Sequence, residues 1–304
     1  MQFKTVSLIG LGALGIAFGQ RLNESLPQGA FRVIASEERC ARYRREGVRA
    51  NGELCEFTYI TPGQNVPPAD LVIVATKDRG LRAAMDDMAS QVGPDTVIIS
   101  LLNGISSEEA ICERWPGQAL WCVALNTDAT RVGQDLRFTK RGVIQFGERD
   151  GSVTPRVKAL EELFTQAGID HELHTDMLFQ QWKKLMINTG LNQVTAVFDV
   201  PYGGIQKPGP AQDAMLAAMH EVVRLAHLEG VPLPEDAPEE WLRTVPAMFD
   251  PEAMPSMRQD VLAHRLTEVE LFSGTVRRRA AKYGLPTPVN DMLYARLKAL
   301  ESTF

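Results

Sequence analysis

A lysine and two asparagines recur at every fourth position: Lys184, Asn188 and Asn192. At about 100° per residue, each step of four rotates a side chain by only about 40°, so one face of an α-helix would carry all three. An ammonium group there could stabilise a developing oxyanion and donate a proton. The neighbouring residues are mostly apolar, and buried polar groups need partners. The three side chains therefore line a polar cleft or form a solvated stripe, and the spacing alone favours the stripe.

Two polar residues near position 260 have simple structural interpretations. Ser256, with Gln259 three positions later, fits a capping box at the start of a helix. Glu268 fits an exposed acid that pairs with Arg265. Taken alone, neither pattern indicates catalysis.

A glycine-rich motif lies near the N-terminus, where Gly10, Gly12 and Gly15 follow an apolar run and precede a helical pattern. In a dinucleotide-binding motif, the first glycine permits a tight turn and the second lets the backbone approach a diphosphate. The third lets helix and strand pack closely. The helix N-terminus would add N–H donors and a partial positive charge. The alternative is a glycine-rich turn without a ligand, but the strand-turn-helix context favours nucleotide binding.

The elements before residue 176 alternate between strand and helix patterns, which predicts a doubly wound, mostly parallel α/β sheet of Rossmann type. The Asn51-Gly52 pair within 48–62 predicts a small inserted hairpin. The predicted strands are 4–10, 31–36, 70–76, 96–102, 120–125 and 142–148, and the predicted helices are 13–26, 37–46, 78–92, 107–115 and 153–167.

Strand patterns fade from residue 176 onward, and helical patterns separated by Pro and Gly replace them. We therefore expect a dinucleotide-binding domain over 1–175 and an all-helical second domain over 176–304. The predicted helices of this second domain are 178–198, 211–229, 236–249, 257–283 and 289–302.

Composition excludes several classes of partner. A formal net charge of −6 leaves no basic field for nucleic acid or an anionic membrane surface. We identify no signal peptide and no apolar stretch long enough to span a bilayer.

The four cysteines lack metal-ligand spacing, so we expect free thiols, no metal and a cytoplasmic location. The oligomeric state stays open, and a homodimer formed through the apolar helical domain is one option.

Taken together, these motifs show that the chain resembles the ketopantoate reductase (2-dehydropantoate 2-reductase) family over nearly its whole length. The phosphate loop of the family matches "GLGALG", and its nicotinamide-side lysine matches Lys77 in "VATKDRG". Its active-site asparagine matches Asn103 in "LLNGISSEE". The remaining matches are the cofactor loop residues Gly10, Leu11, Gly12, Ala13, Leu14 and Gly15, the catalytic residues Lys184 and Glu268, and the substrate-side residues Asn188, Asn192 and Ser256, with Asp260 also fitting the pattern.

The resemblance implies hydride transfer from NADPH to 2-dehydropantoate, giving pantoate on the route to pantothenate and coenzyme A. It implies that Lys184 is the proton donor, that Glu268 accepts from a substrate hydroxyl or holds the lysine, and that the site lies between the two domains. Two alternatives stay open. One is a reductase or dehydrogenase of another 2-keto or 3-hydroxy acid, and the other is a nucleotide-binding sensor without turnover.

The choice between NADP and NAD is left open by the residues after the second predicted strand. The family's reference members have an arginine there for the 2′-phosphate, whereas this chain has Ser36, Glu37 and Glu38. Carboxylates would repel a phosphate and favour NAD, while Arg39 or Arg42 would attract it. We expect NADP with Arg39 as a cofactor ligand, and NAD is not excluded. The segment "ALNTDATRVG" also lacks the family's usual character, which leaves the keto acid less defined than the chemistry.

Overall fold

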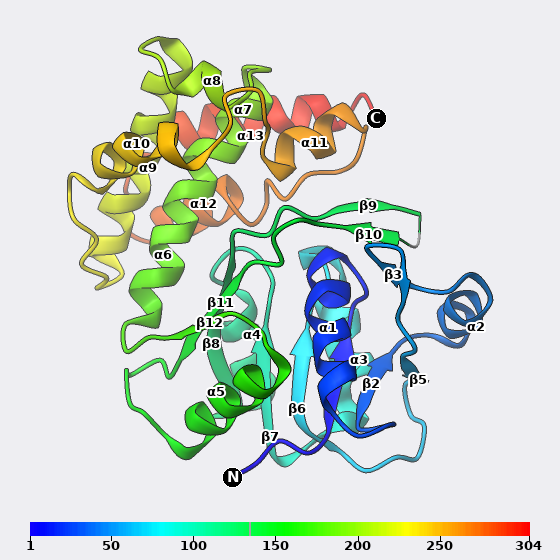
Figure 1. Ribbon diagram of the computed structural model, residues 1–304. Coiled ribbons are helices and arrows are strands. Elements are labelled where there is room, and N and C mark those ends of the chain that lie inside the picture. The colour runs from blue at the N-terminus through cyan, green and yellow to red at the C-terminus, as the bar shows by residue number, and fades with distance from the viewer. Residues whose placement is uncertain (134) are drawn as a thin grey trace. The chain divides into compact units, whose positions relative to one another are not determined.

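The computed structural model describes residues 1–133 and 135–304, which form two compact units, Met1–Met177 and Leu178–Phe304 (Figure 1). The first unit has a Rossmann-type core of mostly parallel strands with helices, and the second is helical. The predicted fold class is therefore confirmed.

The main sheet of the first unit contains eight strands among the described residues, in the order β12-β11-β8-β7-β6-β1-β2-β5. Neighbouring strands of this sheet run parallel except β8 and β11. Their bounds are β1 Val6–Ile9, β2 Phe31–Ile34, β5 Thr58–Ile60, β6 Ala69–Val74, β7 Val92–Ser100, β8 Ala119–Leu125, β11 Val143–Gly147 and β12 His171–Leu173.

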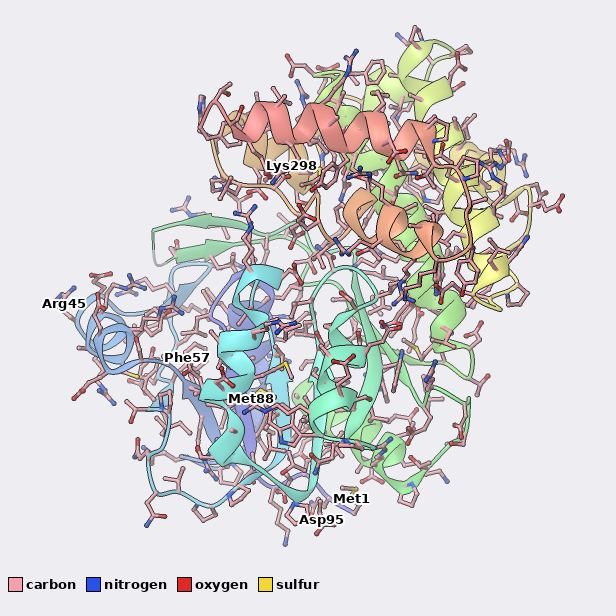
Figure 2. The ribbon with its side chains drawn as sticks, turned by 180° about the vertical axis from the view of Figure 1, so that it is seen from behind. Met1, Arg45, Phe57, Met88, Asp95 and Lys298 are labelled. Atoms are coloured by element: carbon pink, nitrogen blue, oxygen red, sulfur yellow. The ribbon has the colours of Figure 1, made fainter. Side chains whose placement is uncertain are left out.

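Helices cover both faces of this sheet, which explains why its central strands are mostly apolar and buried. They are α1 Ala13–Ser25, α2 Glu37–Glu46, α3 Leu81–Asp87, α4 Ser107–Arg114 and α5 Pro155–Ala167. Figure 1 shows α1 and α5 on one face, and Figure 2 shows α3 and α4 on the other. Met88, labelled in Figure 2, is fully buried at the end of α3.

The chain order reverses beside β1, because β2 lies on one side of it and β6 on the other. Ligands of doubly wound sheets bind at the carboxyl ends of the strands at this switch point. The glycine motif follows β1 directly, so the fold places it at that position.

The predicted helix 78–92 is wrong as a single element. The structure has the 3₁₀ turn η1 (Asp78–Gly80), then α3, then the 3₁₀ turn η2 (Ala89–Gln91). Gly80 stands at the start of α3, and glycine inside a helix costs about 1 kcal/mol relative to alanine. Only α3 carries buried apolar residues, whereas η1 has no buried residue and η2 buries only Gln91.

The predicted hairpin is confirmed, with Asn51 and Gly52 at φ values of 52° and 85° between β3 (Arg49–Ala50) and β4 (Glu53–Leu54). It belongs to a separate small sheet of order β4-β3-β10-β9. The strands β9 (Thr130–Val132) and β10 (Asp135–Arg137) were not predicted, nor were β5 and β12. Each has three residues, too few for a period-two pattern to be recognised.

The described second unit contains helices and no strand. The predicted helix 178–198 is present but includes the five-residue π segment η3 in its middle. The bounds are α6 Met177–Ile187, η3 Asn188–Asn192, α7 Gln193–Val197, α8 Tyr202–Ile205, α9 Pro210–Leu228, α10 Ala237–Met248, α11 Ser256–Leu262, α12 Ser273–Ala281 and α13 Pro288–Glu301.

The predicted helix 257–283 is also wrong as a single element, because a loop over 263–272 separates α11 from α12. His264 adopts a φ of 49°, in the left-handed region. The backbone N–H of Thr267 donates to Glu301 in α13 instead of to a helical carbonyl. Tertiary hydrogen bonding therefore overrides the helical pattern of this segment.

Candidate functional site

Two glycines of the loop are required by the loop's own packing. Gly10 has a φ of 101°, and a Cβ there would lie 2.6 Å from the backbone carbonyl of Ala75. A Cβ on Gly15 would lie 2.0 Å from the carbonyl oxygen of Gly10. Any side chain at either position would force the backbone apart, so these two glycines alone do not indicate a ligand.

Gly12 has no such internal requirement. Its φ of −81° suits any residue, and a Cβ would meet only the carbonyl oxygen of Ala75, at an ordinary 3.6 Å. Gly12 is the N-cap of the 13-residue helix α1, whose first turn has no acidic residue. The first N–H groups of a helix lack partners within it and favour an anion. The glycine therefore fits a backbone approached by an external anionic group such as a diphosphate.

The other predicted cofactor residues follow neighbouring strands at the same edge of the sheet. Lys77 comes three residues after β6, Asn103 three after β7, and Arg39 lies in the first turn of α2 after β2. Leu11, Ala13 and Leu14 belong to the glycine loop and the start of α1, where Leu11 is buried. The fold thus brings these predicted residues to the carboxyl ends of adjacent parallel strands.

The acidic pair after β2 has a structural explanation. The Ser36 hydroxyl accepts from the Arg39 N–H and caps α2, and Glu37 and Glu38 occupy its first turn. Carboxylates are stabilised there by the helix dipole. Arg39 is exposed, whereas the guanidinium of Arg42 lies 5.3 Å from the ring centre of Tyr43. The two glutamates therefore need no ribose contact to account for their presence.

The second unit holds the predicted catalytic helix. Lys184 and Asn188 are half-buried, Asn192 is 7% exposed, and neighbouring Lys183 is exposed. Helix α11, which begins at Ser256, packs against η3 and α7. The segment with Ser256 thus lies beside the segment with Asn192 within the same unit.

The predicted capping box is wrong, and Glu268 is not an exposed acid. Pro255 is the N-cap of α11, and Ser256 makes no side-chain capping bond, so the predicted capping box does not form. Arg265 pairs with Asp260, whose carboxylate accepts from the arginine Nε at 2.7 Å. Glu268 is half-buried in the loop 263–272.

That loop is anchored beside Glu268 by a residue that the sequence did not point to. The buried carboxylate of Glu301 accepts from the N–H and the hydroxyl of Thr267, each at 2.7 Å, and from Lys298 at 2.9 Å. Figure 2 labels Lys298 on α13. Burial by itself raises the pKa of Glu301, but the hydrogen bonds from Lys298 and Thr267 outweigh it and hold that pKa below its ordinary value. Glu301 is 34 positions from Thr267, so no local pattern could reveal the contact.

Replacement of Glu301 by alanine is expected to lower the free energy of unfolding by about 1–3 kcal/mol, because two buried Thr267 donors lose their acceptor. Because the pKa of Glu301 is lower in the folded than in the unfolded chain, its ionised form stabilises the fold at pH values above the unfolded pKa of about 4.3. This stabilisation is lost as the pH falls through the folded pKa. Urea unfolding of wild type and variant at pH 7 and below pH 4 measures both effects. Glu235→Ala, at an exposed loop position, is the control. Equal stability of the three proteins at pH 7 would contradict the anchor.

Metal ligation and a membrane-spanning helix are both unsupported by the described residues. No group of three or more His, Cys, Asp or Glu side chains could hold a metal ion. No helix is long and apolar enough to cross a membrane.

Comparison with known proteins places this geometry in context. The family model described as ketopantoate reductase PanE/ApbA matches residues 6–151, and its C-terminal counterpart matches residues 176–301. A 2-dehydropantoate 2-reductase of Pyrobaculum aerophilum is 28% identical, with 97% of each chain covered. The corresponding enzyme of Streptococcus pyogenes is 24% identical, with 98% of each covered.

Solved structures share the fold. A ternary structure of D-mandelate dehydrogenase with NADH and anilino(oxo)acetate is 25% identical, covers 98% of this chain and 99% of its own, and has a TM-score of 0.84. A PanE/ApbA family ketopantoate reductase from Ralstonia eutropha is 23% identical, covers the same shares and has a TM-score of 0.85. With family models matched in both units, the chain belongs to the ketopantoate reductase family.

Proposed function

We propose that this protein reduces 2-dehydropantoate to pantoate with NADPH, a step toward pantothenate and coenzyme A. The observation that carries the proposal is the helix with Lys184, Asn188 and Asn192 in a chain whose two units both match the ketopantoate reductase family. A protein that only sensed nucleotide would have no need for a proton donor on that helix.

The bound nicotinamide supplies the hydride, which passes to the keto carbon of the substrate. In the proposal, the ammonium group of Lys184 lies at the carbonyl oxygen, where it stabilises the negative charge that develops there. It then donates the proton that completes the alcohol. Lysine suits both tasks because it carries a compact charge and three donors.

The remaining residues orient the substrate. Glu268 accepts from a substrate hydroxyl or keeps Lys184 in place, and its own loop is fixed by the contact between Thr267 and Glu301. We assign Asn188, Asn192 and Ser256 to the substrate's carboxylate and hydroxyl groups, which need donors. Asn103 positions the nicotinamide and the substrate. Holding reacting groups in place in this way contributes to rate by removing the entropy of bringing them together.

A second candidate is reduction of another 2-keto acid or oxidation of the matching hydroxy acid. The similarity to D-mandelate dehydrogenase, 25% identical over 98% of this chain, favours this alternative. The two activities share hydride transfer to a 2-keto acid and differ in the substituent that the keto carbon carries. Steady-state turnover on a panel that includes 2-dehydropantoate and phenylglyoxylate, each with NADPH and NADH, separates them. A higher kcat/KM for phenylglyoxylate would replace the first proposal by the second, and no turnover on any keto acid would contradict both.

For the cofactor we expect a higher kcat/KM with NADPH than with NADH. Arg39→Ala should lower the NADPH value and leave the NADH value unchanged, because only NADPH carries the 2′-phosphate. Arg45→Ala is the control, since Arg45, labelled in Figure 2, lies in the last turn of the same helix and pairs with Glu46. A tenfold preference of the wild type for NADH, about 1.4 kcal/mol, would reverse the assignment.

A further inference from the structure

The helix with Lys184 changes its winding between the residues assigned to the substrate. Residues Asn188–Asn192 form a π segment within an otherwise α-helical run. A π turn has about 4.4 residues, so four residues rotate by roughly 330° instead of about 400°. In a uniform α-helix Asn192 would lie about 80° around the axis from Lys184. With ideal π geometry the segment would remove about 70° of that rotation and bring Asn192 close to the line of Lys184.

This winding displaces backbone hydrogen bonds that an α-helix would make. In an α-helix the carbonyl of Thr189 would accept from the backbone N–H of Gln193. Here that N–H is directed to the carbonyl of Gly190. The Thr189 carbonyl accepts from the side-chain amide of Gln193 instead, at 2.7 Å. The side chain of Gln193 thus takes over a bond that its own backbone would otherwise make.

The side-chain oxygen of Gln193 also accepts hydrogen bonds. Its oxygen accepts from the N–H of Ser273, at 3.2 Å, and from the Ser273 hydroxyl. Thr195 supports the same segment, because its hydroxyl donates to the carbonyl of Leu191 at 2.8 Å. The side chains of Gln193, Thr195 and Ser273 are at most 3% exposed, so water does not compete for these bonds.

Buried polar groups cost stability unless they are paired, and a paired network favours one backbone arrangement over its alternatives. The Gln193 amide bonds the Thr189 carbonyl while the backbone N–H of Gln193 is directed to Gly190. The segment also packs closely against α9, since a Cβ on Gly190 would lie 2.6 Å from the Met219 side chain. The residues that bond to the π segment, Gln193, Thr195 and Ser273, have no assigned role in the reaction.

We propose that Gln193, held by Ser273, is a positioning residue that maintains the π segment and so aligns Lys184, Asn188 and Asn192 toward one substrate. This inference rests on the proposed function, because it assumes that these three side chains meet the keto acid. Gln193 itself acts through the backbone of Thr189 and touches neither substrate nor cofactor.

Replacement of Gln193 by methionine keeps the length and removes the amide. We expect kcat/KM for the best keto acid to fall about ten- to a hundredfold, the scale of a misplaced reacting group. The Kd for the cofactor, measured by fluorescence titration, should stay within twofold. Gln181→Met is the matched control, since Gln181 is 2% exposed on α6 and its side-chain nitrogen makes no hydrogen bond among the described residues. This control should retain the wild-type kcat/KM.

A crystal structure of the Gln193→Met variant determines whether residues 188–192 are still π-helical, independently of turnover. Retention of the π segment in that structure would overturn the proposal. Loss of the π segment without any change in kcat/KM would also overturn it. If Lys184→Ala is inactive in the same assays, the proposed function would still stand. If neither Lys184→Ala nor Gln193→Met changes turnover, the proposed function itself fails. Should Gln193→Met not fold, Ser273→Ala, which keeps the bond to Thr189, is expected to show a smaller loss in the same direction.

Discussion

Replacement of Lys184 by alanine is expected to lower kcat for the best keto acid by at least about 100-fold, which corresponds to about 2.7 kcal/mol. The ammonium group is assigned to charge that appears mainly in the transition state, so its loss should reduce kcat more than it raises KM. The Kd for the cofactor should change little, because the diphosphate is assigned to the glycine loop of the other unit. Steady-state kinetics and a cofactor titration on the same preparation give all three values.

Lys183 provides an internal control for that result. It precedes Lys184 on α6, points about 100° away around the helix axis and is exposed. Lys183→Ala should therefore keep kcat within a few fold of the wild type. If the two variants behave alike, or if Lys183 is the critical residue, the assignment of the proton donor is wrong.

Replacement of Gly12 by valine is expected to weaken binding of the nicotinamide nucleotide by at least about tenfold, or 1.4 kcal/mol. The added side chain would occupy the space assigned to the diphosphate. Folding should be affected much less, because the backbone at Gly12 suits any residue and its Cβ would meet only Ala75 at 3.6 Å. Exchange of a glycine N-cap for valine costs at most about 1 kcal/mol. Isothermal titration and urea unfolding measure the two quantities separately.

Gly15→Ala should show the opposite pattern. Its Cβ would lie 2.0 Å from the carbonyl oxygen of Gly10, an overpacking that typically costs about 1–3 kcal/mol of stability. The contrast between a binding defect at Gly12 and a folding defect at Gly15 identifies the loop as a ligand site. Unchanged nucleotide affinity in a folded Gly12→Val variant would mean that the loop is only a turn.

The sequence predicted those parts of the fold whose local patterns agree with their tertiary surroundings. The central strands are mostly apolar because helices cover both faces, so β1, β2, β6, β7 and β8 could be recognised. The Asn51-Gly52 hairpin was predictable because a tight turn demands those residue types. The glycine spacing likewise follows from backbone geometry at Gly10 and Gly15.

The parts that escaped prediction depend on contacts between distant residues. The loop with Glu268 interrupts a helical pattern because Glu301 captures the N–H of Thr267. The buried bonds beside the π segment join Gln193 and Ser273, which are 80 positions apart. Neither partner stands out in the sequence, and a uniform helix was the simplest interpretation of residues 178–198. The roles of Lys184 and Glu268 were suggested by resemblance to a family and not by spacing, and they stay proposals.

The small sheet of the first unit has a consequence for how the chain is made. Its hairpin around Asn51 is completed only by β10, and the Asn51 side chain accepts from Phe138, 87 positions later. A ribosome adds about 5–20 residues per second, so the free edge of β3 waits roughly 4–17 s for its partner. The hairpin is short and bears Arg49 and Glu53, and short, charged edges resist pairing with other chains. We therefore expect the short, charged hairpin to resist pairing with other chains while it waits for β10 during synthesis.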